Sequence, residues 1–242
     1  MSGYYDEKLA AGSLERAYQL APPRIQQYLR AEVDFVVANV PSASLVLDLG
    51  CGYGRTLPAL ARRAAFVVGI DTSVTSLALA RERLRAYPNV LLAHMNAGSL
   101  AFAEDSFDAV VCIQNGISAF GIDKRGLINE SLRVLRPGGR ALYSTYAERF
   151  WDDRMEWFER QAAAGLIGAV DHERSGNGTI VCRDGLRLTA VAPAEFAGLI
   201  AGLDVGFETL EIDGSSRFYI LQKPCRPPRD PEGTAQASSP AL

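Results

Sequence analysis

Short apolar runs alternate with segments of helical periodicity along most of the chain. Runs of this length, bounded by glycine, proline or polar residues, are typical of strands that are buried on both faces of a sheet. The predicted strands are residues 45–49, 66–70, 90–93, 107–113, 140–145, 207–212 and 218–222. The predicted helices between them are residues 57–63, 73–85 (capped by Ser73 or Thr72) and 124–135. Alternating strands and helices predict a parallel sheet.

The last two predicted strands are joined by residues 213–217 alone. A parallel connection needs a crossover of about a dozen residues or more, so these two strands must be antiparallel. Another helix is predicted just before them, at residues 193–203. The predicted fold class is therefore α/β, a Rossmann-like, doubly wound sheet of seven strands with an antiparallel last strand.

Helical patterns and a hairpin pattern flank this core. We expect Ser13 to cap a first short helix, and a second helix to follow Pro23 until Pro41 stops it. A long helix rich in aromatic residues is predicted at 149–166, and a hairpin is predicted around residues 183–185. The predicted parts are an N-terminal helical cap (1–40), a Rossmann-like core (41–148), an insertion of helix and hairpin (149–192), the end of the core (193–223) and a disordered tail (224–242).

Composition narrows the function classes. The 242 residues, 48% of them hydrophobic, fit one α/β domain with insertions. A formal net charge of -3 without a basic run argues against nucleic acid as a partner. No apolar run approaches the roughly 18 residues of a membrane span, and the N-terminus lacks a secretory leader. The cysteines are scattered without a C-x-x-C pair, so we predict a cytoplasmic protein with free thiols and no metal site.

The candidate chemistry begins with the sequence DLGCGYG at residues 48–54, which ends the first predicted strand. Glycines at this place let the backbone pass close to a ligand where the next helix begins. Asp71 ends the second strand, and a carboxylate there can accept hydrogen bonds from both hydroxyls of a ribose. Together these residues indicate a ligand that contains adenosine.

The spacing of the glycines separates two kinds of adenosine-containing ligand. A dinucleotide loop has the form G-x-G-x-x-G, but here the third glycine, Gly54, comes one place early and Arg55 stands where that glycine would be. This disfavours an NAD(P)-dependent oxidoreductase. The acidic G-x-G-x-G form, with Asp48 two residues before the first glycine, resembles motif I of the class I S-adenosylmethionine-dependent methyltransferases. The resemblance is strong over residues 44–145, which include LRPGG before the fifth strand, and extends to 193–223 in topology only.

This resemblance implies S-adenosylmethionine as cofactor, with the glycine loop facing its methionine part and Asp48 orienting the loop and the amino group. Asp71 would hold the ribose, and Asn96 would address the adenine although an aspartate is commoner there. The cofactor-binding residues implied in this way are Asp48, Gly50, Cys51, Gly52, Gly54, Asp71, Thr72, Asn96, Ala97 and Gln114. A protein that binds the cofactor without turnover is the alternative from another class.

The acceptor is expected to be a small organic molecule methylated on oxygen, nitrogen or sulfur. Residues 112–115 lack the Asn-Pro-Pro-Tyr form of many nucleic-acid N-methylating enzymes. The candidate acceptor-binding residues are Tyr5, Asn115, Tyr146 and Trp151, and the candidate general base is His172. Core packing would explain the aromatic residues of the inserted helix equally well, so a substrate lid is one of two interpretations. A monomer or a homodimer is expected.

Overall fold

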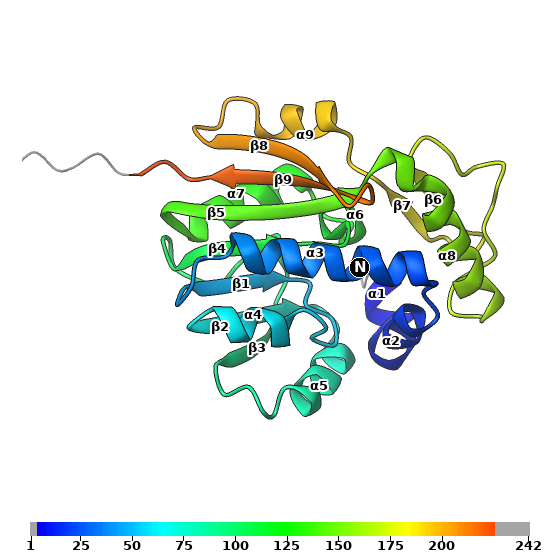
Figure 1. Ribbon diagram of the computed structural model, residues 1–242, viewed down its shortest axis with the longest axis horizontal. Coiled ribbons are helices and arrows are strands. Elements are labelled where there is room, and N and C mark those ends of the chain that lie inside the picture. The colour runs from blue at the N-terminus through cyan, green and yellow to red at the C-terminus, as the bar shows by residue number, and fades with distance from the viewer. Residues whose placement is uncertain (1–3, 226–242) are drawn as a thin grey trace, which may run out of the picture.

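The structure, a computed structural model, describes residues 4–225 apart from the side chains of residues 6 and 7 (Figure 1). Its central sheet has seven strands in the order β3-β2-β1-β4-β5-β9-β8. The strands are β1 (Leu45–Leu49), β2 (Phe66–Asp71), β3 (Val90–His94), β4 (Phe107–Cys112), β5 (Leu135–Tyr146), β8 (Gly206–Ile212) and β9 (Ser216–Gln222). Neighbours from β3 to β5 are parallel, and β9 is antiparallel to both β5 and β8. The predicted fold class is confirmed.

Helices cover both faces of the sheet because successive strand residues point to opposite sides. On one face, α3 (Pro23–Asn39), α4 (Leu57–Arg63) and α5 (Val74–Arg83) form a cluster with strand residues such as Val46. On the other face, α6 (Gly116–Ala119), α7 (Lys124–Val134) and α9 (Pro193–Ile200) form a cluster with residues such as Leu47. The two layers bring the carboxyl ends of the parallel strands to one edge.

The N-terminal helices and the inserted segment lie side by side beyond that edge (Figure 1), and their apolar side chains form a third cluster. It contains α1 (Tyr4–Glu7), α2 (Ala11–Gln19), the 3-10 turn η1 (Glu148–Phe150), α8 (Trp151–Ala163) and the hairpin β6 (Thr179–Val181) and β7 (Arg187–Thr189). The indole of Trp157 in α8 donates to the Ala17 carbonyl of α2 at 2.9 Å. The N-terminal helices and the insertion therefore form one body.

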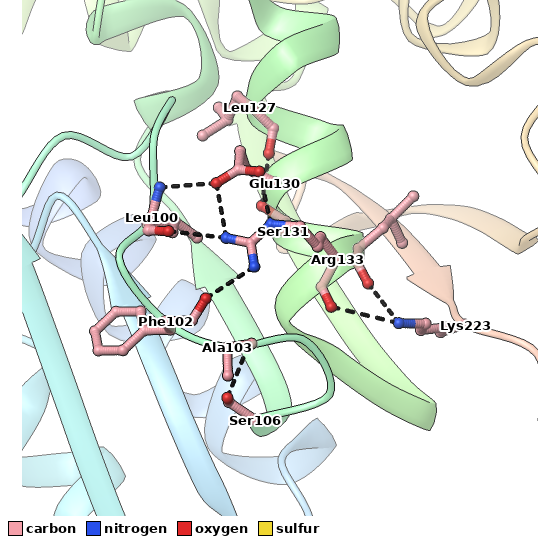
Figure 2. A network of polar contacts seen from close by, with 10 residues as sticks. Leu100, Phe102, Ala103, Ser106, Leu127, Glu130, Ser131, Arg133 and Lys223 are labelled. Carbon is pink, nitrogen blue, oxygen red and sulfur yellow. Dashed lines mark hydrogen bonds and ion pairs between the residues drawn. The ribbon is translucent and has the colours of Figure 1, made fainter.

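Polar contacts hold the loop that follows β3 against α7 (Figure 2). The Arg133 guanidinium donates to the carbonyls of Leu100 and Phe102, each at 2.8 Å, and Glu130 accepts the Leu100 N–H at 2.8 Å. Lys223, just after β9, donates to the carbonyls of Leu132 at 2.9 Å and Arg133 at 3.5 Å and so ties the end of α7 to the last strand. This network fixes the segment between β3 and β4, which carries Asn96.

Several expectations about element ends are wrong. Ser13 lies inside α2, which begins at Ala11 with no side-chain cap. The strand expected at 140–145 starts earlier, because β5 begins at Leu135 and includes residues 137–139, with a register shift opposite Phe107 and Ala109. The helices expected at 149–166 and 193–203 are shorter, as α8 and α9 show. The expected cap Ser73 is confirmed, since its hydroxyl accepts the Ser76 N–H.

The tail expected to be disordered falls, from residue 226 on, outside the described residues. In the part that is described, we find no helix with the length and apolar character to cross a membrane. The four cysteines are free.

Candidate active site

A cavity of about 270 Å³ lies at the carboxyl ends of β1, β2 and β4, beneath the N-terminal helices. Its floor comes from the strand ends and the loops that follow them. Its roof comes from α1 and α2, and its far wall comes from β5 and α8. The residues that line it include Tyr5, Tyr18, Asp48, Gly50, Cys51, Gly52, Arg55, Asp71, Thr72, Asn96, Ala97, Gln114, Phe120, Tyr146, Trp157, Phe158 and Gln161.

The glycine loop folds back on the end of β2. The N–H groups of Gly50 and Cys51 both donate to the Ile70 carbonyl at 2.9 Å. Gly50 has φ +72°, and a Cβ on it would lie 2.4 Å from the Phe120 ring, so only glycine fits. Gly54, with φ +84°, faces Ala80 and Leu84 and does not line the cavity. Gly54 thus shapes the turn and gives no surface to a ligand.

Asp71 joins the glycine loop to the start of α5. Its Oδ2 accepts the Gly52 N–H at 2.8 Å, and its Oδ1 accepts the Ser73 N–H at 2.8 Å. Two backbone donors orient the carboxylate, which lines the cavity beside Thr72. Each carboxylate oxygen can accept more than one hydrogen bond, so the group can also serve a pair of ligand hydroxyls.

Asp48 is a buried carboxyl in the floor of the cavity, with 2% of its surface exposed. The Thr56 hydroxyl donates to its Oδ2 at 2.6 Å. Burial raises the pKa of Asp48 to about 7, against the opposite effects of the Thr56 hydrogen bond and the Arg55 charge. A ligand cation placed at this carboxyl would stabilise its ionised form.

The Asn96 side chain turns back on its own loop, where its Oδ1 accepts the Gly98 N–H at 2.8 Å. Asn96 and Ala97 line the cavity at the end of β3, together with apolar Met95 and Ile122. A flat, partly polar group such as a nucleobase suits this end of the cavity.

Gln114 and Asn115 follow β4 in the left-handed conformation, with φ +56° and +59°. Gln114 lines the cavity, and its Oε1 accepts the hydroxyl of Tyr18 from α2. Asn115 points away: its Oδ1 accepts the Thr145 hydroxyl at 2.7 Å, and its Nδ2 donates to the Thr189 carbonyl at 3.2 Å. Two consecutive left-handed residues send the neighbouring side chains in different directions, so Asn115 is a scaffold residue and not an acceptor ligand.

Of the other expected acceptor residues, Tyr5 and Tyr146 line the cavity. Trp151, the first residue of α8, does not line the cavity and packs, partly buried, against the third cluster. His172 does not either; its side chain is 65% exposed, with Nε2 3.4 Å from Glu159. Neither Trp151 nor His172 is therefore in a position to touch a ligand of this cavity.

Further side chains line the cavity: Gln161 and Tyr18 were not predicted, and Trp157 and Phe158 were considered only as part of the aromatic inserted helix. Trp157, Phe158 and Gln161 from α8 face the cavity, and Tyr18 of α2 covers it. The helical spacing of 154, 157, 158 and 161 marks one buried face of α8 and is the signal that could have found them. Among the described residues, no group of three histidines, cysteines or carboxylates could hold a metal ion.

Comparison with known proteins adds to this geometry. Residues 46–139 match the protein family described as a methyltransferase domain. Among curated proteins, the chain is similar to the demethylmenaquinone methyltransferase of Clavibacter sepedonicus, with 35% identity over 147 residues that cover 61% of this chain and 58% of that protein. The chain therefore spans little more than half the length of this relative.

Two solved structures share the fold. The PH0226 protein from Pyrococcus horikoshii has a TM-score of 0.63 and 22% identity, and the match covers 84% of this chain and 93% of that one. The N-methyltransferase NodS from Bradyrhizobium japonicum, bound to S-adenosyl-L-homocysteine, has a TM-score of 0.57 and 15% identity, with 88% and 98% covered. At these identities the likeness concerns the fold.

The sheet order, the glycine loop after β1 and the carboxylate at the end of β2 define a class of α/β proteins that bind adenosine-containing ligands at the carboxyl ends of their strands. The family match narrows this class. Residues 46–139 match a methyltransferase domain, in agreement with the resemblance to the class I S-adenosylmethionine-dependent methyltransferases. The resemblance found in the sequence is confirmed.

Proposed function

We propose that this protein transfers the methyl group of S-adenosylmethionine to an oxygen, nitrogen or sulfur atom of a small, largely apolar ring compound. The observation that carries the proposal is one continuous cavity. It joins the carboxylates Asp48 and Asp71 at one end to the aromatic side chains Tyr146, Trp157 and Phe158 at the other. A cofactor and an acceptor can therefore meet inside it.

The cofactor half fits S-adenosylmethionine in its donor set. Asp71 would hold the ribose hydroxyls, Asp48 the cationic amino group, and Asn96 with Ala97 the adenine. Bound there, the cofactor supplies an electrophilic methyl carbon on a sulfonium. Its positive charge and its hydroxyl pair are what two carboxylates in one cavity can recognise.

The acceptor half works by orientation and exclusion of water. Tyr5 and Tyr18 cover the cavity, and the aromatic rings of α8 close its far wall. Holding an acceptor in line with the methyl group can lower the activation free energy by roughly 7 to 11 kcal/mol in well-arranged systems. The name of the relative, a demethylmenaquinone methyltransferase, also supports an apolar ring compound as acceptor.

We further propose that the protein acts in the cytoplasm as a monomer or homodimer and does not bind nucleic acid. The net charge of -3 supports the last point. The alternatives are an NAD(P)-dependent oxidoreductase and a protein that holds S-adenosylmethionine without turnover. Calorimetry with S-adenosylmethionine, S-adenosylhomocysteine and NAD distinguishes a methyltransferase from an oxidoreductase, because an oxidoreductase should bind only the dinucleotide.

The decisive test is a screen of small phenols, hydroxyquinones, amines and thiols, read by release of S-adenosylhomocysteine and by the mass of the product. Asp71→Asn serves as the matched control, since it removes the ribose carboxylate while it keeps the size of the side chain. Methylated product from wild type, with much less from the control, supports the proposal. Tight cofactor binding without turnover of any acceptor would favour the binding protein instead.

A further inference from the structure

A buried arginine stands directly behind the acceptor half of the cavity. Arg154 of α8 is 1% exposed, and its guanidinium carbon lies 4.1 Å from the ring centre of Tyr146 and 5.6 Å from that of Phe158. Both rings line the cavity. Nη1 donates to the Gly178 carbonyl at 2.8 Å, and Nη2 donates to the Leu188 carbonyl at 2.9 Å. The hairpin thus fixes the cation against the wall of the site.

The positive charge of Arg154 has no negative partner in the described part of the chain. No described carboxylate lies within 4.0 Å, and its Nε, although buried, has no hydrogen-bond partner. The titratable groups that face the guanidinium are the phenols of Tyr146 (β5), Tyr28 (α3) and Tyr5 (α1). Burial lowers the pKa of Arg154, and each of these phenols raises it. Carbonyl oxygens solvate the guanidinium but do not neutralise it, so burial of this charge is costly unless an anion joins it.

One carboxyl faces the same region from α3. Beyond the effect of burial, the charge of an ionised Glu32 raises the pKa of Tyr146. The Oε1 atom of Glu32 accepts hydrogen bonds from the hydroxyls of Ser144 at 2.5 Å and Ser216 at 2.9 Å. Burial raises the pKa of Glu32, which favours its neutral form. The charged residues that line the cavity are Asp48, Arg55 and Asp71. The Arg55 guanidinium lies 5.1 Å from the ring centre of Tyr18. The charged group in contact with the rings of Tyr146 and Phe158 is therefore the Arg154 guanidinium.

The described lining of the acceptor half also lacks a general base. Its polar groups are phenols, an indole and the amide of Gln161, with no imidazole or carboxylate among them. Burial raises the pKa of Tyr146 to about 12, so its phenol stays protonated at neutral pH and donates hydrogen bonds. A neutral hydroxyl on the acceptor would keep its proton here, whereas an ionised hydroxyl needs no base.

We propose that the acceptor is an ionised hydroxyl, a phenolate or an enolate, and that Arg154 is the residue that sets this specificity by placing its charge behind Tyr146. The proposal rests on the proposed methyltransferase function. A lone pair of the oxyanion forms the new O–CH₃ bond as the C–S bond breaks, and the bonding pair stays on sulfur. No proton has to move, which matches the absence of a base. Arg154 acts through Tyr146 and is a positioning residue.

The probe for this proposal is 4-nitrophenol, whose phenolate is yellow and whose ionisation near neutral pH can be followed by absorption. The full chain, saturated with S-adenosylhomocysteine, is titrated with the probe from pH 5 to 9. We expect the bound probe to ionise at a pH at least about one unit lower than the free probe, a tenfold change in its ionisation constant. Nitrobenzene, which has the same ring without the hydroxyl, should compete weakly.

Variants locate the effect. Arg154→Met keeps the length and removes the charge, and should abolish the shift. Arg160→Met is the control on the same helix, because Arg160 is exposed and paired with Glu156, and it should leave the shift intact. If Arg154→Met does not fold, Arg154→Lys, which keeps the charge, should retain most of the shift.

Two results overturn the proposal. One is a bound probe that ionises at the same pH as the free probe or at a higher pH. The other is an acceptor site that binds nitrobenzene as tightly as 4-nitrophenol, or that binds neither compound. In each case calorimetry still reports S-adenosylhomocysteine binding. Loss of that binding from wild type would instead contradict the proposed function, so the two failures are distinct.

Discussion

Asp48 makes the stability of this protein depend on pH in a predictable direction. The carboxyl has a pKa of about 7 in the fold and 3.8 when exposed. Protonation therefore stabilises the folded state, fully below pH 3.8, and this contribution is lost as pH rises to about 7. This difference in pKa corresponds to a loss of roughly 4 kcal/mol in the free energy of unfolding, of which about 3 kcal/mol is lost between pH 5 and pH 8.

Asp48→Asn tests this prediction, since the amide keeps the shape and cannot ionise. We expect the free energy of unfolding of wild type to fall, relative to that of the variant, by roughly 3 kcal/mol from pH 5 to pH 8. Urea unfolding of both proteins at each pH measures this difference and cancels the other titrating groups. Thr56→Val should extend the loss to higher pH, because it removes the hydroxyl that donates to the carboxylate. A difference that is flat to within about 0.5 kcal/mol would refute the reasoning, because Asp48 would then ionise in the fold as it does in water.

Asp71→Asn should weaken S-adenosylhomocysteine binding by roughly 1 to 3 kcal/mol in calorimetry, because a charge-assisted acceptor is lost; unchanged affinity would show that Asp71 does not hold the ribose. Gly50→Ala should cost roughly 2 to 4 kcal/mol in urea unfolding, from the positive φ and the overlap with Phe120. The control Gly185→Ala, at φ +97° with open space around it, should cost only the conformational part, and equal losses would contradict the overlap. Asp184→Asn should raise the KM for the acceptor more than that for the cofactor, because Asp184 accepts from Tyr4 and Lys8 and so holds α1 over the cavity. Its stability cost should stay near 1 kcal/mol or less, since the Lys8 side chain is 46% exposed and water screens the pair. An unchanged acceptor KM would show that α1 does not act as a lid.

The order of strands and helices in the core could be predicted from the sequence because each follows from local patterns. A fully buried strand needs a continuous apolar run, and β1 and α4 begin and end where those runs do. The cofactor end is also local: the turn after β1 needs glycine at a positive φ, and parallel neighbours bring the ends of β1 and β2 together. For this reason the sequence alone predicted that Asp48, Gly52 and Asp71 lie together at this edge of the sheet, where they line the cavity.

Only the tertiary structure decided the acceptor end. Tyr4 and Asp184 are 180 positions apart, and no local pattern reports that their side chains meet. Periodicity marked an apolar stripe on the inserted helix, but the packing of α2 decided that Trp157 and not Trp151 faces the cavity. Helical spacing alone cannot tell a solvated cation from one buried behind a binding site. The place of Arg154 depends on where the hairpin docks, because the carbonyls that accept from it come from residues 178 and 188.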